Sequence, residues 1–549
     1  MKTRHLLLLV IIFIGIFLRF YRLKDFPVQL NHDEITQLYD AISIAQTGKD
    51  IYGNFLPFIF PSVGDFKPPF YTYITSIFYI VFGSGEVTIR LPAVLFGLLM
   101  IPAVYFFTLK LLKNNRIALL AALLTSIAPF ELFFSRKSFE SGAGIFLMLL
   151  GFSYLLFYVE VKSKPKLLFL AAASFGIAIY TYFSHAIIIP LLLVVFGLIY
   201  RKSLIENFKQ IRWPLTLLLC FILPILILTI TNSDTRYRSQ TVFITQDINL
   251  GKNIEYSKQK NSLLAFLTRN KAILDFSFNR YLEQFDVRYI FGNGLEFTNQ
   301  GPLDMGPLFL IQLPFLILGG IYLVKLKAFN KEKKFILAWI LVGMLPSGLT
   351  FETHSPHRSI MVFTMFDIIS AVGLYMFLKI INGINSQYNF MKRFILSFLI
   401  LVFIINIVYF THMYFVNFPF EKSQSIHYPY KEVSLFAWSQ YSKFAHIIVD
   451  PIYGQSAPVG AVGVHYYLAY YGQYLPSKFQ NDLKIEQSGT SFDKFTIRQI
   501  DWRKDQFLKS TLIIASPWSI PIADIDKSKI IKIFHFYDGQ PAFYAVKLN

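Results

Sequence analysis

The chain has 549 residues, of which 54% are hydrophobic and 15% are charged, and its mean hydropathy is +0.48. This composition is too apolar for a water-exposed globular surface, so it excludes the soluble classes and indicates an integral membrane protein. The formal net charge of +19 does not indicate a nucleic-acid partner, because most Lys and Arg residues fall in short gaps between apolar runs. The single cysteine, Cys220, excludes an intramolecular disulfide and a cysteine metal cluster.

About eleven apolar runs are long enough to cross the hydrocarbon core of a bilayer as helices. They lie near residues 6–22, 88–109, 117–134, 139–160, 167–183, 185–200, 213–231, 305–324, 335–350, 359–379 and 394–415. The first run follows Lys2 and Arg4 but lacks a small-residue cleavage pattern, so we interpret it as a retained anchor. The sequence predicts an α-helical polytopic membrane protein with about eleven transmembrane helices.

The charges of the short loops predict an orientation. Lys and Arg concentrate in every second loop, near residues 110–116, 162–166, 201–212, 325–334 and 379–393. Because basic loops stay in the cytoplasm, the N-terminus is predicted there, in the cytoplasmic (inner) membrane. Three larger segments then lie outside the cell: the loops near 23–87 and 232–304, and the tail from residue 416.

The tail, residues 416–549, is predicted to form a separate small α/β domain beside a membrane module of residues 1–415. Its apolar β-rich runs at 445–450 and 511–516 are separated by helix-like segments. It ends in two strands, 530–536 and 542–548, around the turn dipeptide Asp538-Gly539, which predicts a hairpin.

The first outer loop contains a helix start with two acidic residues. Asn31 is the predicted N-cap and Glu34 its capping-box partner, and the helix is expected to end at Gly48. Its apolar residues follow helical spacing, which predicts an amphipathic helix on the membrane surface. Asp33 and Glu34 are candidate catalytic residues, although the helix dipole alone also favours acidic residues in a first turn.

Four cations on the outer side are candidate anion ligands. Lys67 precedes two prolines, which hold the chain extended, and Arg90 stands at the start of the second span. The alternatives are a lysine that snorkels to the surface and a headgroup anchor. Arg136 and Arg358 lie in two further outer connections. Near Arg358, the residues Glu352, His354 and His357 have spacing that is weakly specific for a metal, so we favour an anion site and predict no metal.

This topology restricts the chemistry. Nucleotide sugars are cytoplasmic, so a transferase acting outside needs a sugar delivered on a polyprenyl phosphate. The leaving phosphate can be stabilised by Lys67, Arg90 and Arg358 without an obligatory cofactor or divalent metal. One carboxylate then suffices as general base, and Asp33 is placed for that role, with Glu34 assisting or only capping its helix.

The same segments resemble the membrane-embedded type C glycosyltransferases, specifically the protein O-mannosyltransferase and aminoarabinose-transferase-like superfamily. The matching motifs are His32-Asp33-Glu34, Gly48-Lys49-Asp50-Ile51-Tyr52-Gly53, Lys67-Pro68-Pro69-Phe70-Tyr71, Phe82-Gly83-Ser84-Gly85-Glu86 and Arg90-Leu91-Pro92, in order. Ser135-Arg136, Tyr180-Thr181-Tyr182 and the segment from Leu345 to Arg358 also look like family positions.

The resemblance implies a role for each of these residues. Asp33 is the catalytic base, Lys67 and Arg90 contact the donor phosphate together with Arg136 and Arg358, and Tyr71, Tyr182 and His357 contact substrate. The partners implied are a polyprenyl-phosphate-linked sugar and an acceptor protein, lipid or glycan.

Two alternatives are a flippase or transporter for lipid-linked sugars and a noncatalytic membrane scaffold. A flippase predicts ionisable residues deep in the spans, and the predicted spans are nearly free of them. A scaffold leaves the ordered loop motifs unexplained. The sequence therefore favours an inverting glycosyltransferase that acts on the outer face of the membrane.

Overall fold

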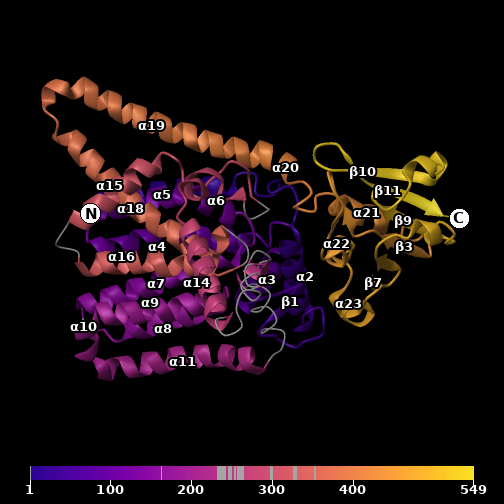
Figure 1. Ribbon diagram of the computed structural model, residues 1–549, viewed down its shortest axis with the longest axis horizontal. Helices are drawn as coiled ribbons and strands as arrows, with labels where there is room; N and C mark the ends of the chain where they lie inside the picture. The colour runs from indigo at the N-terminus through magenta and orange to yellow at the C-terminus, as the bar shows by residue number, and fades with distance from the viewer. Residues whose placement is uncertain are drawn as a thin grey trace. The chain divides into compact units, whose positions relative to one another are not determined.

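A computed structural model of the chain describes residues 2–62, 64–161, 164–231, 243–244, 250–252, 255, 265–296, 301–325, 330–350 and 354–548. Much of the predicted loop 232–304, and the candidate Glu352, therefore lie outside the described residues. The chain divides into two compact units (Figure 1). Unit 1 comprises residues 1–21 and 93–413, and unit 2 comprises residues 22–92 and 414–549.

Unit 1 is helical. Its helices are α1 (Lys2–Phe20), α4 (Leu91–Leu112, which begins at the end of unit 2), α5 (Asn115–Ile127), α6 (Pro129–Ser135), α7 (Glu140–Val161), α8 (Lys166–Ile179), α9 (His185–Ile199), α10 (Arg201–Ile205), α11 (Phe208–Thr231), α14 (Ala265–Glu283), α15 (Gln312–Lys325), α16 (Asn330–Gly343), α17 (Leu345–Gly348), α18 (Pro356–Gly383) and α19 (Asn389–His412). In Figure 1, α7, α8, α9 and α11 lie side by side.

The number of membrane spans differs from the prediction. Within the described residues, five helices are long and apolar enough to cross a membrane, or six if α5 and α6 form one span with a 55° bend. The predicted runs at 167–183, 185–200, 305–324 and 335–350 contain helices of 14 or 15 residues, and the run at 6–22 lies in α1, which has 19 residues but is not one of these five helices. The count of eleven is thus not confirmed. Only 6% of the apolar stretch that contains α19 and 11% of that in α11 are buried, as expected for helices that face lipid.

Buried polar residues join the helices of unit 1, although the predicted spans had seemed nearly free of ionisable groups. The Asp367 carboxylate in α18 accepts hydrogen bonds from Gln312 Nε2 at 2.7 Å and Thr125 Oγ1 at 3.2 Å. Arg19 in α1 lies 3.7 Å from Glu131 in α6. Because these ionisable groups are buried and paired with side chains of other helices, they connect neighbouring helices.

Unit 2 combines the first outer loop with the tail. The loop contributes α2 (His32–Thr47), α3 (Pro69–Phe82) and the hairpin of β1 (Phe60–Ser62) and β2 (Asp65–Lys67). The tail contributes α20 (Phe418–Glu421), α21 (Tyr430–Ser439), α22 (Val464–Tyr471), α23 (Pro476–Asp482), α24 (Trp502–Asp505), and the strands β3 (His446–Val449), β4 (Ile452–Tyr453), β5 (Val459–Gly460), β6 (Lys484–Glu486), β7 (Gly489–Phe492), β8 (Phe495–Ile497), β9 (Thr511–Ala515), β10 (Ile530–His535) and β11 (Pro541–Leu548).

The tail forms an α/β fold around a seven-stranded sheet in the order β10-β11-β9-β3-β8-β7-β6. The central strand β3 pairs in parallel with both β8 and β9, and the other pairs are antiparallel. The predicted terminal hairpin is present, and Gly539 adopts a φ of 87° in its turn, a left-handed conformation that glycine tolerates without strain.

Helix α2 is buried within unit 2, whereas the sequence predicted an amphipathic helix on the membrane surface. It packs against α3 on one side and against α22 and α23 of the tail on the other. Tyr467 donates from its hydroxyl to Leu30 O at 2.8 Å, and Tyr39 donates to Tyr474 O at 2.7 Å. The compact units therefore divide the chain differently from the predicted boundary near residue 416, which stays a prediction for the division between membrane module and outer domain.

Candidate active site

Two segments of unit 2 bring Asp33 and Lys67 together. Asp33 is the second residue of α2, and Lys67 ends β2, directly before the Pro68-Pro69 start of α3. Lys67 Nζ lies 2.7 Å from Asp33 Oδ1 and donates to Asp33 O at 3.2 Å. The Asp33 side chain is 38% exposed, whereas that of Lys67 is 6% exposed. The carboxylate is therefore accessible, and the ammonium lies beneath it.

Glu34 lies in the interior and caps its own helix. Its backbone N–H donates to Asn31 Oδ1 at 2.8 Å, and its Oε2 accepts from Asn31 N at 3.2 Å, so the predicted capping box is confirmed. Its other oxygen, Oε1, lies 3.2 Å from Arg90 Nε, and the side chain is 1% exposed. Of the acidic pair, only Asp33 can therefore meet a substrate at the surface of unit 2.

In the structure Arg90 contacts other groups of the protein, whereas the sequence predicted that it contacts the donor phosphate. Its side chain is fully buried, and besides Glu34 it donates to Leu23 O at 3.1 Å and to Gln29 O at 3.2 Å. Burial by itself lowers the pKa of the guanidinium, but the adjacent Glu34 carboxylate outweighs this and raises it. Arg90 thus fixes the chain that leads into α2.

Tyr71, predicted to contact substrate, is also buried. Its side chain is fully covered, and its hydroxyl donates to Ile89 O at 2.7 Å, directly before Arg90. A buried phenol is satisfied by such a bond. In the described structure Tyr71 therefore holds the residue next to Arg90 in place.

Two histidines extend the group around Asp33. His32 Nε2 lies 3.5 Å from Asp33 Oδ2, and the ring of His427 meets that of His32 edge to face at 5.3 Å. Burial and, to a smaller extent, the neighbouring His32 lower the pKa of His427 to about 3 against the opposing effect of Asp33, so His427 is neutral near pH 7. Sequence reasoning missed His427, because no motif surrounds it and only the tertiary fold places it near Asp33.

Unit 1 contains the other four predicted site residues. Tyr182, between α8 and α9, meets His357 at the start of α18 with ring centroids 6.2 Å apart, and Phe139 stacks on His357 at 6.3 Å. Arg358 is the next residue of α18, and the first turn of this helix contains no acidic residue. A helix N-terminus with a cation and no carboxylate attracts anions.

Arg136 has structural partners. It is 2% exposed and donates from Nη1 to Leu18 O and Arg19 O, both at 2.9 Å. These carbonyls belong to the last turn of α1, where a cation stabilises the helix end. The phosphate contact predicted for Arg136 stays a prediction.

The histidines near Arg358 do not form a described metal centre. Among the residues that the structure describes, no group of three or more His, Cys, Asp or Glu side chains is arranged to hold a metal ion. His354 Nε2 lies 3.1 Å from Glu283 O, and its ring packs on Tyr289 at 4.8 Å.

The stability of unit 2 is expected to depend on pH, because the unit contains buried histidines. Burial lowers the pKa of His465 to about 4, so between about pH 4 and 6.5 the unfolded chain binds a proton that the folded chain does not, and the fold loses stability as the pH falls. Asp40 has the opposite effect on stability, because burial raises its pKa well above the ordinary value.

The effect of His465 is therefore isolated by comparing variants. The His465→Gln variant should lose less thermal stability than the wild type when the pH falls from 7.5 to 5. The exposed His535→Gln is the control, and an equal loss in all three proteins would contradict the assignment.

Comparison with known proteins places this geometry in context. Residues 66–228 match the family described as dolichyl-phosphate-mannose-protein mannosyltransferase. A search of curated proteins gave no match.

Solved structures match over almost the whole chain. The ArnT protein of Cupriavidus metallidurans, in its apo state, matches with a TM-score of 0.55 and 13% identity, over 99% of this chain and 97% of ArnT. The same protein bound to undecaprenyl phosphate gives a TM-score of 0.52 over the same shares of both chains. The apo oligosaccharyltransferase of Archaeoglobus fulgidus matches with a TM-score of 0.50 and 14% identity, over 85% of this chain and 64% of the other. The resemblance predicted from the sequence is confirmed: this multi-pass membrane protein is similar to the type C membrane glycosyltransferases.

Proposed function

We propose that this protein is an inverting glycosyltransferase that moves a sugar from a polyprenyl-phosphate donor to an acceptor hydroxyl on the outer face of the cytoplasmic membrane. The observation that carries the proposal is the accessible Asp33 carboxylate, held 2.7 Å from Lys67 at the start of α2. A base beside a cation is the minimum that this transfer requires.

In the proposed reaction, Asp33 takes the proton of the acceptor hydroxyl while that oxygen attacks the anomeric carbon. The bond from this carbon to the phosphate oxygen breaks, and the polyprenyl phosphate leaves with the electron pair. The ammonium of Lys67 neutralises the leaving phosphate. Without substrate, Lys67 pairs with Asp33. When a donor phosphate binds to Lys67, its negative charge offsets that of the ammonium, and this makes the Asp33 carboxylate more basic.

The comparisons support the donor class. ArnT has been solved with undecaprenyl phosphate bound, and the matching family is described by a dolichyl-phosphate sugar. Tyr182, His357 and Arg358 are proposed as further donor contacts, because Arg358 stands at an anion-attracting helix start. Mannose is the first sugar to test, and the acceptor classes are protein, lipid and glycan.

The test is transfer of radiolabelled sugar from a panel of polyprenyl-phosphate donors by the purified full chain in lipid. The expected result is turnover with one donor and release of polyprenyl phosphate. If no donor supports transfer, but the labelled lipid crosses the bilayer when the protein is present, the protein is a flippase and the proposal is wrong.

Lys67→Gln is expected to weaken use of the donor. Because the variant loses a charge-assisted hydrogen bond to the donor phosphate, its KM for the donor should rise by about tenfold or more. Lys49→Gln, an exposed lysine of the same segment, is the matched control. Equal donor KM values in the two variants would contradict the phosphate contact.

A further inference from the structure

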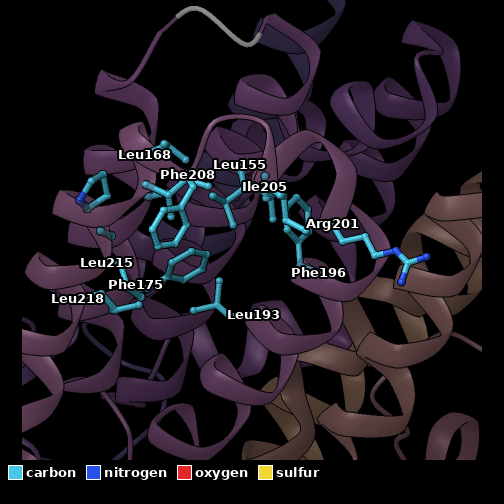
Figure 2. A pocket seen from close by; sticks show the side chains of 16 residues that line it. Leu155, Leu168, Phe175, Leu193, Phe196, Arg201, Ile205, Phe208, Leu215 and Leu218 are labelled. Atoms are coloured by element: carbon cyan, nitrogen blue, oxygen red, sulfur yellow. The ribbon is translucent and has the colours of Figure 1, made fainter.

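Unit 1 contains a cavity that is lined by none of the residues proposed above as donor contacts. This cavity of about 420 Å³ lies among α7, α8, α9, α10 and α11 (Figure 2). Its walls are almost wholly apolar, with Phe175 from α8, Leu193 and Phe196 from α9, and Leu215 and Leu218 from α11. The volume is in the range of ordinary ligand sites. An apolar cavity of this size favours a hydrocarbon chain over water.

The cavity opens to the surface of unit 1. Ile205 and Phe208, which line it, are 72% and 62% exposed. Trp213 at the same helix ends is 60% exposed and stacks beneath the Arg212 guanidinium at 5.5 Å. Exposed tryptophan and arginine at the end of an apolar helix are typical of the membrane–water interface. The opening therefore lies where the headgroups of a bilayer begin.

One cation stands at this opening. Arg201 lines the cavity with its aliphatic part, and Figure 2 shows its guanidinium pointing away from the labelled apolar side chains. Within the described part of the chain, its guanidinium forms no hydrogen bond or ion pair. The exposed Lys202, Lys209 and Arg212 surround it in sequence, against the single acidic residue Glu206.

We propose that this cavity binds an anionic diacyl phospholipid, with one acyl chain between α8, α9 and α11 and the phosphate on Arg201. The charge of the opening selects an anionic headgroup, because basic pockets between membrane helices concentrate such lipids. The apolar walls supply no polar partner for a sugar or a nucleotide, which leaves a lipid chain as the occupant.

The glycine Gly197 in α9 permits a direct test. It lines the cavity, and a Cβ added to it meets nothing within 4 Å, so a leucine there is expected to fill part of the cavity. The matched control is Gly320→Leu in α15, where an added Cβ also meets nothing within 4 Å. For the charge, Arg201→Gln is compared with Arg116→Gln, an exposed arginine of another basic loop.

The measurement is native mass spectrometry of the purified full chain with phosphatidylglycerol or phosphatidylethanolamine of identical acyl chains. The wild type should bind phosphatidylglycerol about tenfold more tightly, because the ammonium of phosphatidylethanolamine cancels the charge of its phosphate and is repelled by Arg201. Arg201→Gln should remove this preference, Gly197→Leu should weaken binding of both lipids, and both controls should match the wild type.

Three outcomes would overturn the proposal: equal binding of the two lipids by the wild type, unchanged preference in Arg201→Gln, or unchanged binding in Gly197→Leu. Tighter binding of a polyprenyl phosphate at this site would overturn the diacyl assignment. Photolabelling of the unaltered protein, with a diazirine in the acyl chain of phosphatidylglycerol, is independent of the variants. Labelled peptides from α9 and α11 support the site, and labelling confined to other helices contradicts it.

Discussion

Replacing Asp33 by asparagine is expected to reduce sugar transfer by a factor of roughly 100 to 10,000, the range that a general base contributes. The amide has the size of the carboxylate but cannot take the acceptor proton. Because Asp33 is 38% exposed and its neighbour Glu34 is buried with two partners, no other carboxylate of the pair can replace it. The measurement is the turnover number with saturating donor.

The fold should survive this change, since an exposed charge in the first turn of a helix contributes only about 0.3 to 1 kcal/mol. Asp25→Asn is the matched control, because Asp25 is 53% exposed and pairs with Arg22 at 3.2 Å. It should leave turnover unchanged. Full activity in Asp33→Asn would move the base elsewhere, whereas equal loss in both variants would indicate a general effect of removing charge from this segment.

Local features of the site could be predicted from the sequence. The capping box of α2 depends on residues within four positions of one another, so Asn31 and Glu34 identified it correctly. The helix also ends at Gly48 as predicted, with a φ of 71° that glycine tolerates. The terminal hairpin followed from its turn residues for the same reason.

Features that depend on the tertiary fold could not be predicted. Nothing in the order of residues reveals that Arg90 and Tyr71 are buried against backbone carbonyls or that His427 reaches the neighbourhood of Asp33. The amphipathic spacing of α2 predicted a helix on the membrane surface, whereas α3 covers one side of it and α22 and α23, far along the chain, cover the other. A periodic pattern identifies one packed face and not the number of layers.

Side chains of the tail contact the first outer loop at several points within unit 2. Glu86 pairs with Lys431 and accepts from the Tyr471 hydroxyl at 3.0 Å. Gln480 Nε2 donates to Ser43 Oγ at 2.9 Å and to Asp50 O at 2.9 Å. The Glu86 contacts hold the segment between α3 and α4, and the Gln480 contacts hold α2 and the loop that follows it, so the tail supports the helix that presents Asp33.

Replacing Arg90 by methionine is expected to destabilise unit 2 by about 3 to 5 kcal/mol, the cost of breaking a buried ion pair from one side. Glu34 then keeps a buried charge without its guanidinium, and the carbonyls of Leu23 and Gln29 lose their donors. The measurement is hydrogen exchange of the amides in residues 22–34, together with the thermal midpoint of the purified protein.

The matched control is Arg22→Met, because the Arg22–Asp25 pair is about half exposed and such pairs contribute about 0 to 1 kcal/mol. Arg90→Met should speed exchange throughout residues 22–34, whereas Arg22→Met should not. The double variant Arg90→Met with Glu34→Leu should be less destabilised than the sum of the single variants, because no lone charge is left buried. If Arg90→Met instead leaves exchange unchanged and raises only the donor KM, Arg90 contacts phosphate, as its position in the sequence predicted, and its ion pair with Glu34 contributes little to the fold.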